Sequence, residues 1–371
     1  MNIKKINIGI NATCFDQRAS GAKNRFIGIY SHVFFKLKNY TFYVYHAKSV
    51  EMSSWFDNNS NVNFIQTNIP SDGRIRKYFI SYLYFIKENK NKKFDIFESF
   101  HLPLIKNKAN YNILTIHDLR FLNVNFFLTK YIYFFIFRNS IKNANKIITV
   151  SNYIKKELSK FINCNKIQNI YNGYSPKKYN HNHEKFSLNK IQINKKFILS
   201  VGHFEKRKNF QNLIKAYNSN DFLRKNYDLI IIGNDNGYKQ RLDKLINQLK
   251  IKNKVKLLLN ISDELLNFYY KNSSLFVFPS SYEGFGIPII EAMYYEIPIA
   301  ASNIEVVKEV SDNSLVYFEY NNFLDISTKI EMILKSPSIK NNQIKKFNQI
   351  LKKYNYENIA NQLISLYKHL D

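Results

Sequence analysis

The chain is poor in residues that cross-link or bend a polypeptide. Among 371 residues it has two cysteines, seven prolines and ten glycines. Cys14 and Cys164 cannot form a disulfide framework, and no Cys/His cluster has the spacing of a metal site. Such cysteine usage is typical of a reducing, cytosolic compartment. The first ten residues, MNIKKINIGI, run directly into a strand-like segment, so we expect no signal peptide.

Long apolar runs are also missing. A membrane-spanning helix needs about 20 apolar residues. The nearest approach, residues 126–137 (FFLTKYIYFFIF), is short and interrupted by Lys130. The sequence therefore excludes an ordinary transmembrane helix. Its 45% hydrophobic and 16% aromatic content predicts a globular protein whose length suits two domains.

Acidic residues are scarce relative to basic ones, 28 against 55, which gives a net charge of +27. This excess indicates an anionic partner: nucleic acid, an acidic membrane or a phosphate-bearing substrate. A nucleotide-biased genome would also account for part of it, because the chain is rich in Lys, Asn, Ile, Phe and Tyr. Residues 79–93 (FISYLYFIKENKNKK) either lie on anionic headgroups or form a core helix followed by a solvated lysine-rich loop.

Short apolar runs alternate with longer helical segments in both halves of the chain, which predicts parallel sheets covered on both faces. In the first half we expect strands at 6–10, 42–45, 62–65, 94–97, 113–116 and 147–150, and helices at 21–36, 74–87, 129–143 and 152–161. In the second half we expect strands at 197–201, 229–232, 255–258, 275–278 and 297–300, and helices at 210–217, 238–249, 263–271 and 322–334. A polar stretch over about 172–190 reads as the linker.

These elements predict an α/β protein with two Rossmann-like domains. We expect an N-terminal domain over 1–180, a C-terminal domain over 181–352 and a last helical segment over 353–371. Ligands of such sheets bind outside the carboxyl ends of the strands. The site is therefore expected in a cleft between the domains.

Residues 278–302 (FPSSYEGFGIPIIEAMYYEIPIAAS) concentrate the scarce turn residues, with three of the seven prolines and two of the ten glycines. Gly284 and Gly286 allow a turn that side chains would block, and Pro288 suits the start of a helix. Unpaired amides at such a helix start favour an anion such as phosphate. Glu283 and Glu291 would then accept hydrogen bonds from sugar hydroxyls beside it. Alternatively, Glu291 simply sits in a first turn, where the helix dipole favours an acid.

A second cluster follows the first strand of the second half. There Gly202 is followed by the consecutive cations Lys206, Arg207 and Lys208 at the start of a helix. Cations crowded at a helix start are unfavourable unless an anion joins them. This pattern favours a phosphate partner over a solvated loop.

The segment EGFGIPIIEAM, followed by PIAAS, resembles the E-x7-E signature of retaining glycosyltransferases of family 4, which have the GT-B fold. The resemblance implies that Glu283 lies beside the donor sugar at the reaction centre and that Glu291 holds the ribose of the nucleotide. It implies that the amides of Phe285 and Gly286 contact the donor diphosphate. The stretch VGHFEKRKN is similar to the family's V-G-x-x-x-x-R-K-N segment, whose Arg and Lys neutralise that diphosphate, here Arg207 and Lys208.

Three further stretches resemble the family's pattern. Thr115–Leu119 is similar to its HD segment, which implies that His117 contacts the donor sugar. Asp118 either orients a group or pairs with Arg120. The loop that carries Gly21, Lys23 and Arg25 corresponds to a Gly-rich loop that cradles the donor phosphate or an acceptor group, although here it is equally a plain helix start. The final helix is implied to cross back to the first domain, with Tyr356 in place of the usual Trp.

The chain departs from the family pattern at four positions. Asn260 and Glu296 stand where glycines are common, and Tyr294 and Tyr295 replace smaller residues. These changes either reshape the pocket for the base or reflect drift. No Asp-x-Asp motif occurs, so we expect no metal and no cofactor, with Arg207, Lys208 and amides carrying the diphosphate charge.

The resemblance implies a hexosyltransferase that moves a sugar such as mannose or glucose from a nucleotide-diphosphate sugar to a surface glycan acceptor. Lipopolysaccharide, O-antigen and capsule are examples of such acceptors. We expect the enzyme in the cytoplasm or at the inner face of the cell membrane. A GT-B epimerase or phosphorylase is the alternative. A basic nucleic-acid-binding protein is a weaker one, because no recognition module is present.

Overall fold

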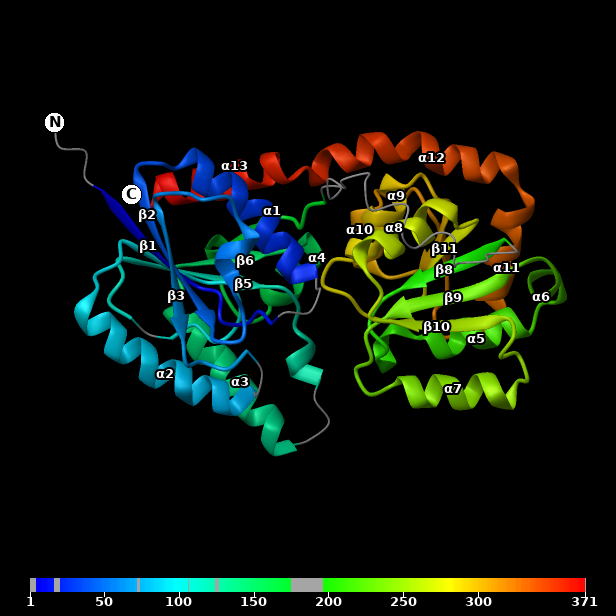
Figure 1. Ribbon diagram of the computed structural model, residues 1–371, viewed down its shortest axis with the longest axis horizontal. Coiled ribbons are helices and arrows are strands. Elements are labelled where there is room, and N and C mark those ends of the chain that lie inside the picture. The colour runs from blue at the N-terminus through cyan, green and yellow to red at the C-terminus, as the bar shows by residue number, and fades with distance from the viewer. Residues whose placement is uncertain are drawn as a thin grey trace. The chain divides into compact units, whose positions relative to one another are not determined.

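The computed structural model describes residues 5–16, 21–71, 74–105, 107–123, 127–174 and 196–370. The chain forms two compact units, Met1–Ser175 with Tyr354–Asp371, and Pro176–Lys353 (Figure 1). The predicted boundary at 180 and most of the predicted linker lie outside the described residues.

The first unit is built on a seven-stranded parallel sheet in the order β3-β2-β1-β4-β5-β6-β7. Its strands are β1 Ile6–Asn11, β2 Tyr40–Ala47, β3 Val62–Thr67, β4 Ile96–Ser99, β5 Tyr111–Ile116, β6 Lys146–Thr149 and β7 Ile167–Asn169. Most of the central positions are buried and apolar, as expected for a sheet covered on both faces.

Helices cover both faces of this sheet (Figure 1). The helices are α1 Gly21–Lys36, α2 Arg74–Asn91, α3 Phe127–Asn143, α4 Asn152–Leu158 and α13 Tyr356–His369. One core joins α1 and α13 to strand residues such as Ile8 and Phe42. The other joins α2, α3 and α4 to strand residues such as Tyr45 and Leu114.

The second unit has a six-stranded parallel sheet in the order β10-β9-β8-β11-β12-β13. Its strands are β8 Phe197–Val201, β9 Asp228–Gly233, β10 Val255–Leu259, β11 Leu275–Phe278, β12 Ile299–Ser302 and β13 Val316–Phe318. Its helices are α5 Phe210–Asn218, α6 Asp221–Asn226, α7 Lys239–Gln248, α8 Asp263–Asn272, α9 Ile287–Tyr294, α10 Glu305–Val310, α11 Phe323–Lys335 and α12 Pro337–Leu351. The predicted α/β architecture with two Rossmann-like sheets is confirmed.

Two predicted strands are displaced by two residues each. β4 covers 96–99 instead of 94–97, because the strand continues through the buried polar residues Glu98 and Ser99. β12 covers 299–302 instead of 297–300. The amide of Ile297 instead bonds to Ala292 O at the end of α9, and Pro298 has no amide hydrogen to give to a sheet.

The last helix, α13, is fixed in the first unit by polar and close-packed contacts. The hydroxyl of Tyr367 donates to Glu98 Oε2 at 2.5 Å in the interior. Burial raises the pKa of the Glu98 carboxyl despite its bonds to tyrosine hydroxyls. The ring of Tyr356 lies against the backbone at both Gly28 and Gly173, where an added Cβ would stand 2.4 and 2.5 Å from ring atoms. Glycine at these two positions therefore lets the helix dock.

No helix among the described residues is long and apolar enough to cross a membrane.

We predict that Gly28→Ala lowers the free energy of unfolding by about 1–3 kcal/mol, because the new methyl overlaps the Tyr356 ring and over-packs the α1–α13 contact. Denaturant titration followed by circular dichroism measures this loss. Phe35→Ala on the same helix, where the ring is exposed, is the control. Equal stability of the Gly28→Ala protein and the unmodified chain would contradict the assigned packing.

Candidate active site

Two loops of the second unit meet because their strands are neighbours. β8 and β11 pair in parallel, so the loops that follow them, at 202–209 and 279–286, leave the same edge of the sheet. The amide of Ser281 donates to Arg207 O at 2.8 Å, and Arg207 Nη1 donates to Tyr282 O at 3.0 Å. Backbone and side-chain bonds thus join the two loops.

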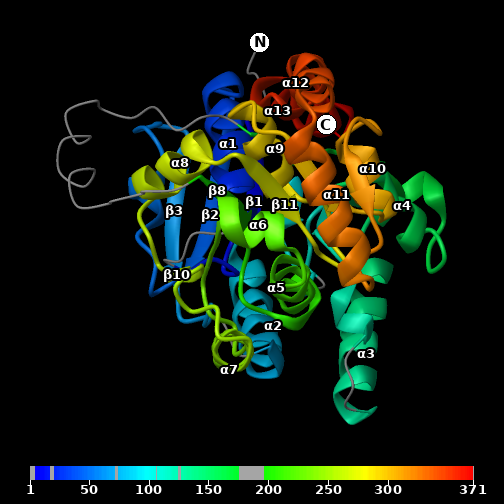
Figure 2. The same ribbon diagram turned by 90° about the vertical axis from the view of Figure 1, so that its right-hand side faces the viewer.

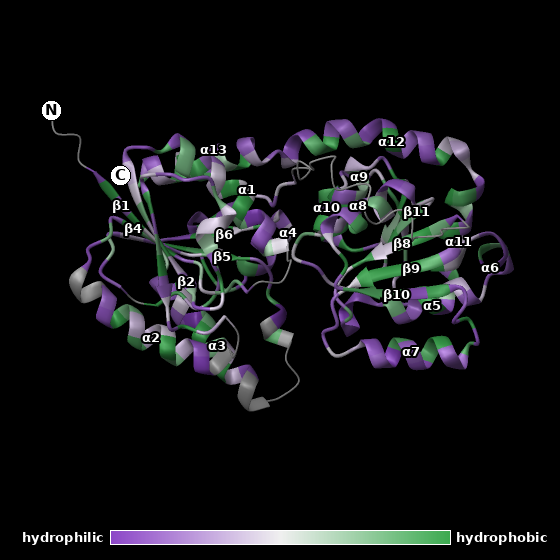
Figure 3. Ribbon diagram, viewed as in Figure 1, coloured by the Kyte–Doolittle hydropathy of each residue, from purple (hydrophilic) through white to green (hydrophobic). Residues whose placement is uncertain are grey.

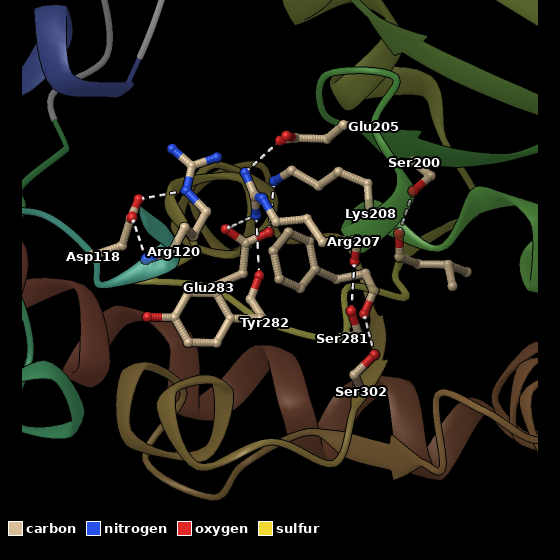
Figure 4. A network of polar contacts seen from close by, with 12 residues as sticks. Asp118, Arg120, Ser200, Glu205, Arg207, Lys208, Ser281, Tyr282, Glu283 and Ser302 are labelled. Atoms are coloured by element: carbon tan, nitrogen blue, oxygen red, sulfur yellow. Dashed lines mark hydrogen bonds and ion pairs between the residues drawn. The ribbon is translucent and has the colours of Figure 1, made fainter. Parts of the chain in front are cut away.

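A cluster of four charged side chains lies where these loops meet (Figure 4). Glu283 Oε1 is 2.6 Å from Lys208 Nζ, and Glu283 Oε2 is 2.7 Å from Arg207 Nη1. Arg207 Nη2 also pairs with Glu205 Oε1 at 2.5 Å. Lys208 and Glu283 are buried. We call Glu205, Arg207, Lys208 and Glu283 the ion-pair cluster; its two cations balance its two carboxylates.

The backbone around Lys208 explains how a lysine is held in the interior. A Cβ at Gly202 would stand 3.1 Å from Lys208 Cε, so the side chain runs closely over that glycine. Its ammonium lies 5.4 Å from the centroid of the Phe278 ring. Asn209 follows with a left-handed φ of 57° and donates to Tyr320 O at 2.6 Å, which ends the 3-10 helix Lys206–Lys208 and starts α5.

The charges of the cluster set its protonation. Burial by itself would raise the pKa of the Glu283 carboxyl, but Lys208 and Arg207 outweigh burial and lower that pKa from 4.5 to about 2. Burial lowers the pKa of Lys208, and Glu283 opposes this effect. The carboxylate is therefore ionised at neutral pH.

The turn that leads into α9 depends on Gly286. Its φ is 108°, a left-handed value that side chains rarely adopt. The helix begins at Ile287 with Pro288 in its first turn. The Phe285 ring is buried, so only backbone of that residue is suited to meet a ligand.

Glu291 lies on α9 and is held by a residue that the sequence did not indicate. The hydroxyl of Tyr270, on α8, donates to Glu291 Oε2 at 2.8 Å. Tyr270 is buried and stacks on Tyr295, with ring centroids 5.5 Å apart and planes 6° apart. Tyr295, one of the departures from the family pattern, thus supports the tyrosine that orients Glu291.

In the first unit, His117 directly follows β5. Its Nε2 donates to Phe100 O at 3.0 Å, which leaves Nδ1 as the acceptor of the neutral ring. Burial and the neighbouring His101 lower the pKa of His117 to about 3, so the imidazole is neutral at physiological pH. The His101 ring stacks on the His117 ring, with the two ring centroids 5.9 Å apart. Asp118 pairs with Arg120 at 2.8 Å, one of the two expected outcomes.

The residues Gly21, Lys23 and Arg25, predicted to lie in a donor or acceptor loop, lie at the start of α1. Gly21 is the first residue of α1, and the residues just before it lie outside the described part of the chain. Lys23 Nζ lies 4.2 Å from the Trp55 ring centroid. Arg25 is buried and donates to Tyr171 O and to Asn172 Oδ1. The structure therefore places Arg25 in the interior of the unit, where it joins α1 to the segment after β7.

Two residues of the site were missed from the sequence. Glu205 precedes the predicted cations and offered no signal of its own. Tyr270 lies 21 positions before Glu291 in an ordinary amphipathic helix. No group of three or more His, Cys, Asp or Glu that could hold a metal occurs in the described ranges.

Comparison with known proteins identifies the family. Residues 182–358 match the family described as "Glycosyl transferases group 1", and residues 40–178 match "Glycosyltransferase Family 4". An uncharacterized glycosyltransferase of Methanocaldococcus jannaschii is 30% identical over 335 residues, which cover 85% of this chain and 88% of that protein. The chain belongs to glycosyltransferase family 4.

A curated relative and a solved structure are also similar to this glycosyltransferase. The O-antigen chain mannosyltransferase RfbU of Salmonella typhimurium is 29% identical over 272 residues, 72% of this chain and 71% of that protein. The crystal structure of Anabaena HepE with UDP and glucose has a TM-score of 0.76 at 14% identity, covering 98% of this chain and 100% of that one. The second match shows a common fold.

We predict that Glu283→Gln lowers the free energy of unfolding by about 3–5 kcal/mol at neutral pH, because it leaves the buried Lys208 and the partly buried Arg207 without this carboxylate. The folded pKa of Glu283 lies below its unfolded value, so this stabilisation is complete above pH 4.5 and is lost as the pH falls through about 2. The difference between the two proteins should shrink over that interval.

Chemical denaturation at several pH values measures this difference. Glu264→Gln, at an exposed position in the first turn of α8, is the matched control and should cost at most about 1 kcal/mol, the contribution of an acid at a helix start. A Glu283→Gln difference that stays constant down to pH 2 would show that the cluster does not set the ionisation of Glu283.

Proposed function

We propose that this chain is a retaining hexosyltransferase. It moves a hexose from a nucleotide-diphosphate sugar to a hydroxyl of a surface glycan. The observation that carries the proposal is the ion-pair cluster, in which two cations and Glu283 converge at the edge of adjacent strands.

The cluster suits a diphosphate donor because its two cations are fixed in position, and their charge is neutralised, by Glu205 and Glu283. An arriving diphosphate competes with Glu283 for Arg207 and Lys208, and charge-assisted bonds from both cations favour it. The freed Glu283 carboxylate then accepts hydrogen bonds from hydroxyls of the donor sugar. In the transition state the leaving diphosphate gains charge, which the same two cations and the amides near Gly286 stabilise. We propose that this chemistry needs no metal ion.

The remaining contacts follow the family resemblance. We assign the donor ribose to Glu291, whose carboxylate is oriented by the hydrogen bond that it accepts from Tyr270. We assign a contact with the donor sugar to His117, whose neutral ring can accept a hydrogen bond from a sugar hydroxyl at Nδ1. The solved structure of HepE, a protein of the same fold, contains UDP and glucose, which supports a nucleotide-sugar donor.

The acceptor assignment rests on the curated relatives. RfbU and a second relative, 31% identical over 175 residues, carry the names of O-antigen mannosyltransferases. We therefore propose mannose as the first sugar to test and a lipid-linked glycan at the inner face of the cell membrane as the acceptor. Recognition of that acceptor is assigned to the first unit.

A panel of nucleotide sugars, read by thermal shift and by slow donor hydrolysis, tests the proposal. At least one donor should stabilise the protein, because a ligand that binds only the folded state shifts its unfolding. Absence of any response to uridine, guanosine, adenosine, cytidine and thymidine diphosphate sugars would reject a glycosyl-transfer function for this site.

Two substitutions in the cluster should separate binding from turnover. Lys208→Met removes a cation from the diphosphate and should weaken binding of the nucleoside diphosphate about tenfold or more. Glu283→Gln removes the competitor for the same cations, so it should retain or tighten that binding while abolishing transfer. Isothermal titration and a transfer assay measure the two effects. Equal loss of binding in both variants would rule out competition between Glu283 and the diphosphate.

Tyr270→Phe tests the support of Glu291. Without the hydroxyl, Glu291 is less well held, and we expect nucleoside diphosphate binding to weaken by about threefold to tenfold with kcat little changed. The penalty for removing a ribose hydroxyl, measured with deoxyribose analogues, should also be smaller in the variant, because the two changes act on one contact. Tyr269→Phe, at the neighbouring tyrosine that packs on Phe197, is the matched control. An unchanged deoxyribose penalty would separate Tyr270 from ribose recognition.

A further inference from the structure

Helix α2 exposes apolar side chains and buries polar ones. Phe79 is 61% exposed and Leu83 69% exposed, and Ile86 continues the same line at spacings of four and three residues. The buried side carries Lys77 and Ser81, in addition to apolar residues such as Phe85. Lys77 Nζ donates there to Thr13 O at 2.8 Å and to Ser71 O at 3.1 Å. This helix therefore presents to solvent the apolar line that amphipathic helices ordinarily bury.

Helix α3 repeats the pattern with its own exposed line. Tyr131 and Phe135 are 58% and 66% exposed. Arg138 and Lys142 follow at spacings of three and four residues, and both are exposed. Two large rings and two cations thus lie along one side of the helix.

The two exposed lines lie on the same side of the first unit. Phe85 of α2 and both Phe137 and Ile141 of α3 belong to one core, together with Leu114 of the sheet. Because both helices cover the same face of the sheet, their outer sides both point away from it (Figures 1 and 2). Figure 3 shows hydrophobic residues distributed along both helices. We call Phe79, Leu83, Ile86, Tyr131 and Phe135, together with the flanking cations Arg138 and Lys142, the α2–α3 face.

The charge of the α2–α3 face selects among possible partners. Helix α2 contains five basic residues, one of which (Lys77) is buried, and one acid, Glu88. Helix α3 contains three basic residues and no acid. Glu88 is paired with Lys92 at 3.0 Å. A second copy of the chain would bring the same positive charge against this face, so self-association is disfavoured. An apolar line bordered by cations matches the surface of a bilayer with anionic headgroups.

We propose that the α2–α3 face docks on an anionic lipid bilayer, with Phe79, Leu83, Ile86, Tyr131 and Phe135 entering the headgroup–acyl boundary and the flanking cations contacting lipid phosphates. The proposal identifies the surface that brings the enzyme to a lipid-linked acceptor. It rests on the proposed function only for that purpose, because binding to lipid needs no donor and no turnover.

Vesicle co-sedimentation with the whole chain tests the docking surface. We expect the protein to sediment with vesicles of phosphatidylcholine and phosphatidylglycerol, to sediment little with phosphatidylcholine alone, and to be released by salt. We expect a partition coefficient into the anionic vesicles that is lower by about tenfold or more for each of two double variants, Phe79→Ser/Leu83→Ser and Tyr131→Ser/Phe135→Ser. The reason is that each variant loses two exposed apolar groups. Arg138→Gln/Lys142→Gln should lose affinity chiefly for the anionic vesicles.

Two exposed apolar residues elsewhere supply matched controls. Phe35→Ser on α1, which packs on the opposite face of the first sheet, and Leu324→Ser on α11 of the second unit should sediment like the unmodified chain. Each serine variant should retain its thermal unfolding temperature, since the replaced side chains are exposed.

Several results would overturn the proposal. They are equal sedimentation with neutral and anionic vesicles, equal loss in the control variants, or no loss in the double variants. A dimer that only the double variants dissociate, without a change in sedimentation, would assign the face to a second copy instead. Transfer to a water-soluble acceptor should be unchanged in the double variants. If the unmodified chain transfers sugar but does not bind anionic vesicles, this surface alone is rejected. Failure of transfer with intact lipid binding rejects the proposed function alone.

Discussion

The second unit depends on burying the Glu283 carboxylate among cations from the loop that follows a neighbouring strand. An ionised carboxylate in a protein interior is costly unless it is paired and hydrogen-bonded. Lys208 and Arg207 meet that requirement only while the loops after β8 and β11 stay in register. The Ser281–Arg207 backbone bond and the contact of Lys208 with Gly202 keep them there. The charges that would meet a donor are thus the same charges that hold two loops of the protein together.

Much of this arrangement could be predicted from the sequence, since the scarce glycines and prolines mark the loop that carries Glu283. Arg207 and Lys208 were likewise identified by their place after a strand. Their direct pairing with Glu283 was not predicted, because adjacency of β8 and β11 appears only in the folded sheet. Tyr270 was missed for the same reason. Residues 79–93 were open to either a membrane or a core interpretation, because the segment's periodicity does not say which side of a helix meets the sheet.

Two of the four departures from the family pattern occur at left-handed backbone positions. Asn260 and Glu296 have φ values of 50° and 54°, in the left-handed region. Glycine is common at such positions because it has no Cβ, and a side chain there costs about 1–2 kcal/mol. Glu296 is therefore a strained position at the end of α9, next to Tyr295, which stacks on Tyr270. These changes leave the fold intact.

The docking of α13 makes the first unit discontinuous along the chain. Tyr356 and Tyr367 complete the packing around Gly28 and Glu98, yet they are separated from it in sequence by the entire second unit. During synthesis from the N-terminus, the ribosome must therefore deliver residues 176–353 before the first unit can close its interior. Until then, Glu98 lacks the hydroxyl of Tyr367, and the side of α1 that packs on α13 stays open to water. The second unit can consequently finish folding while the first still waits for its last helix.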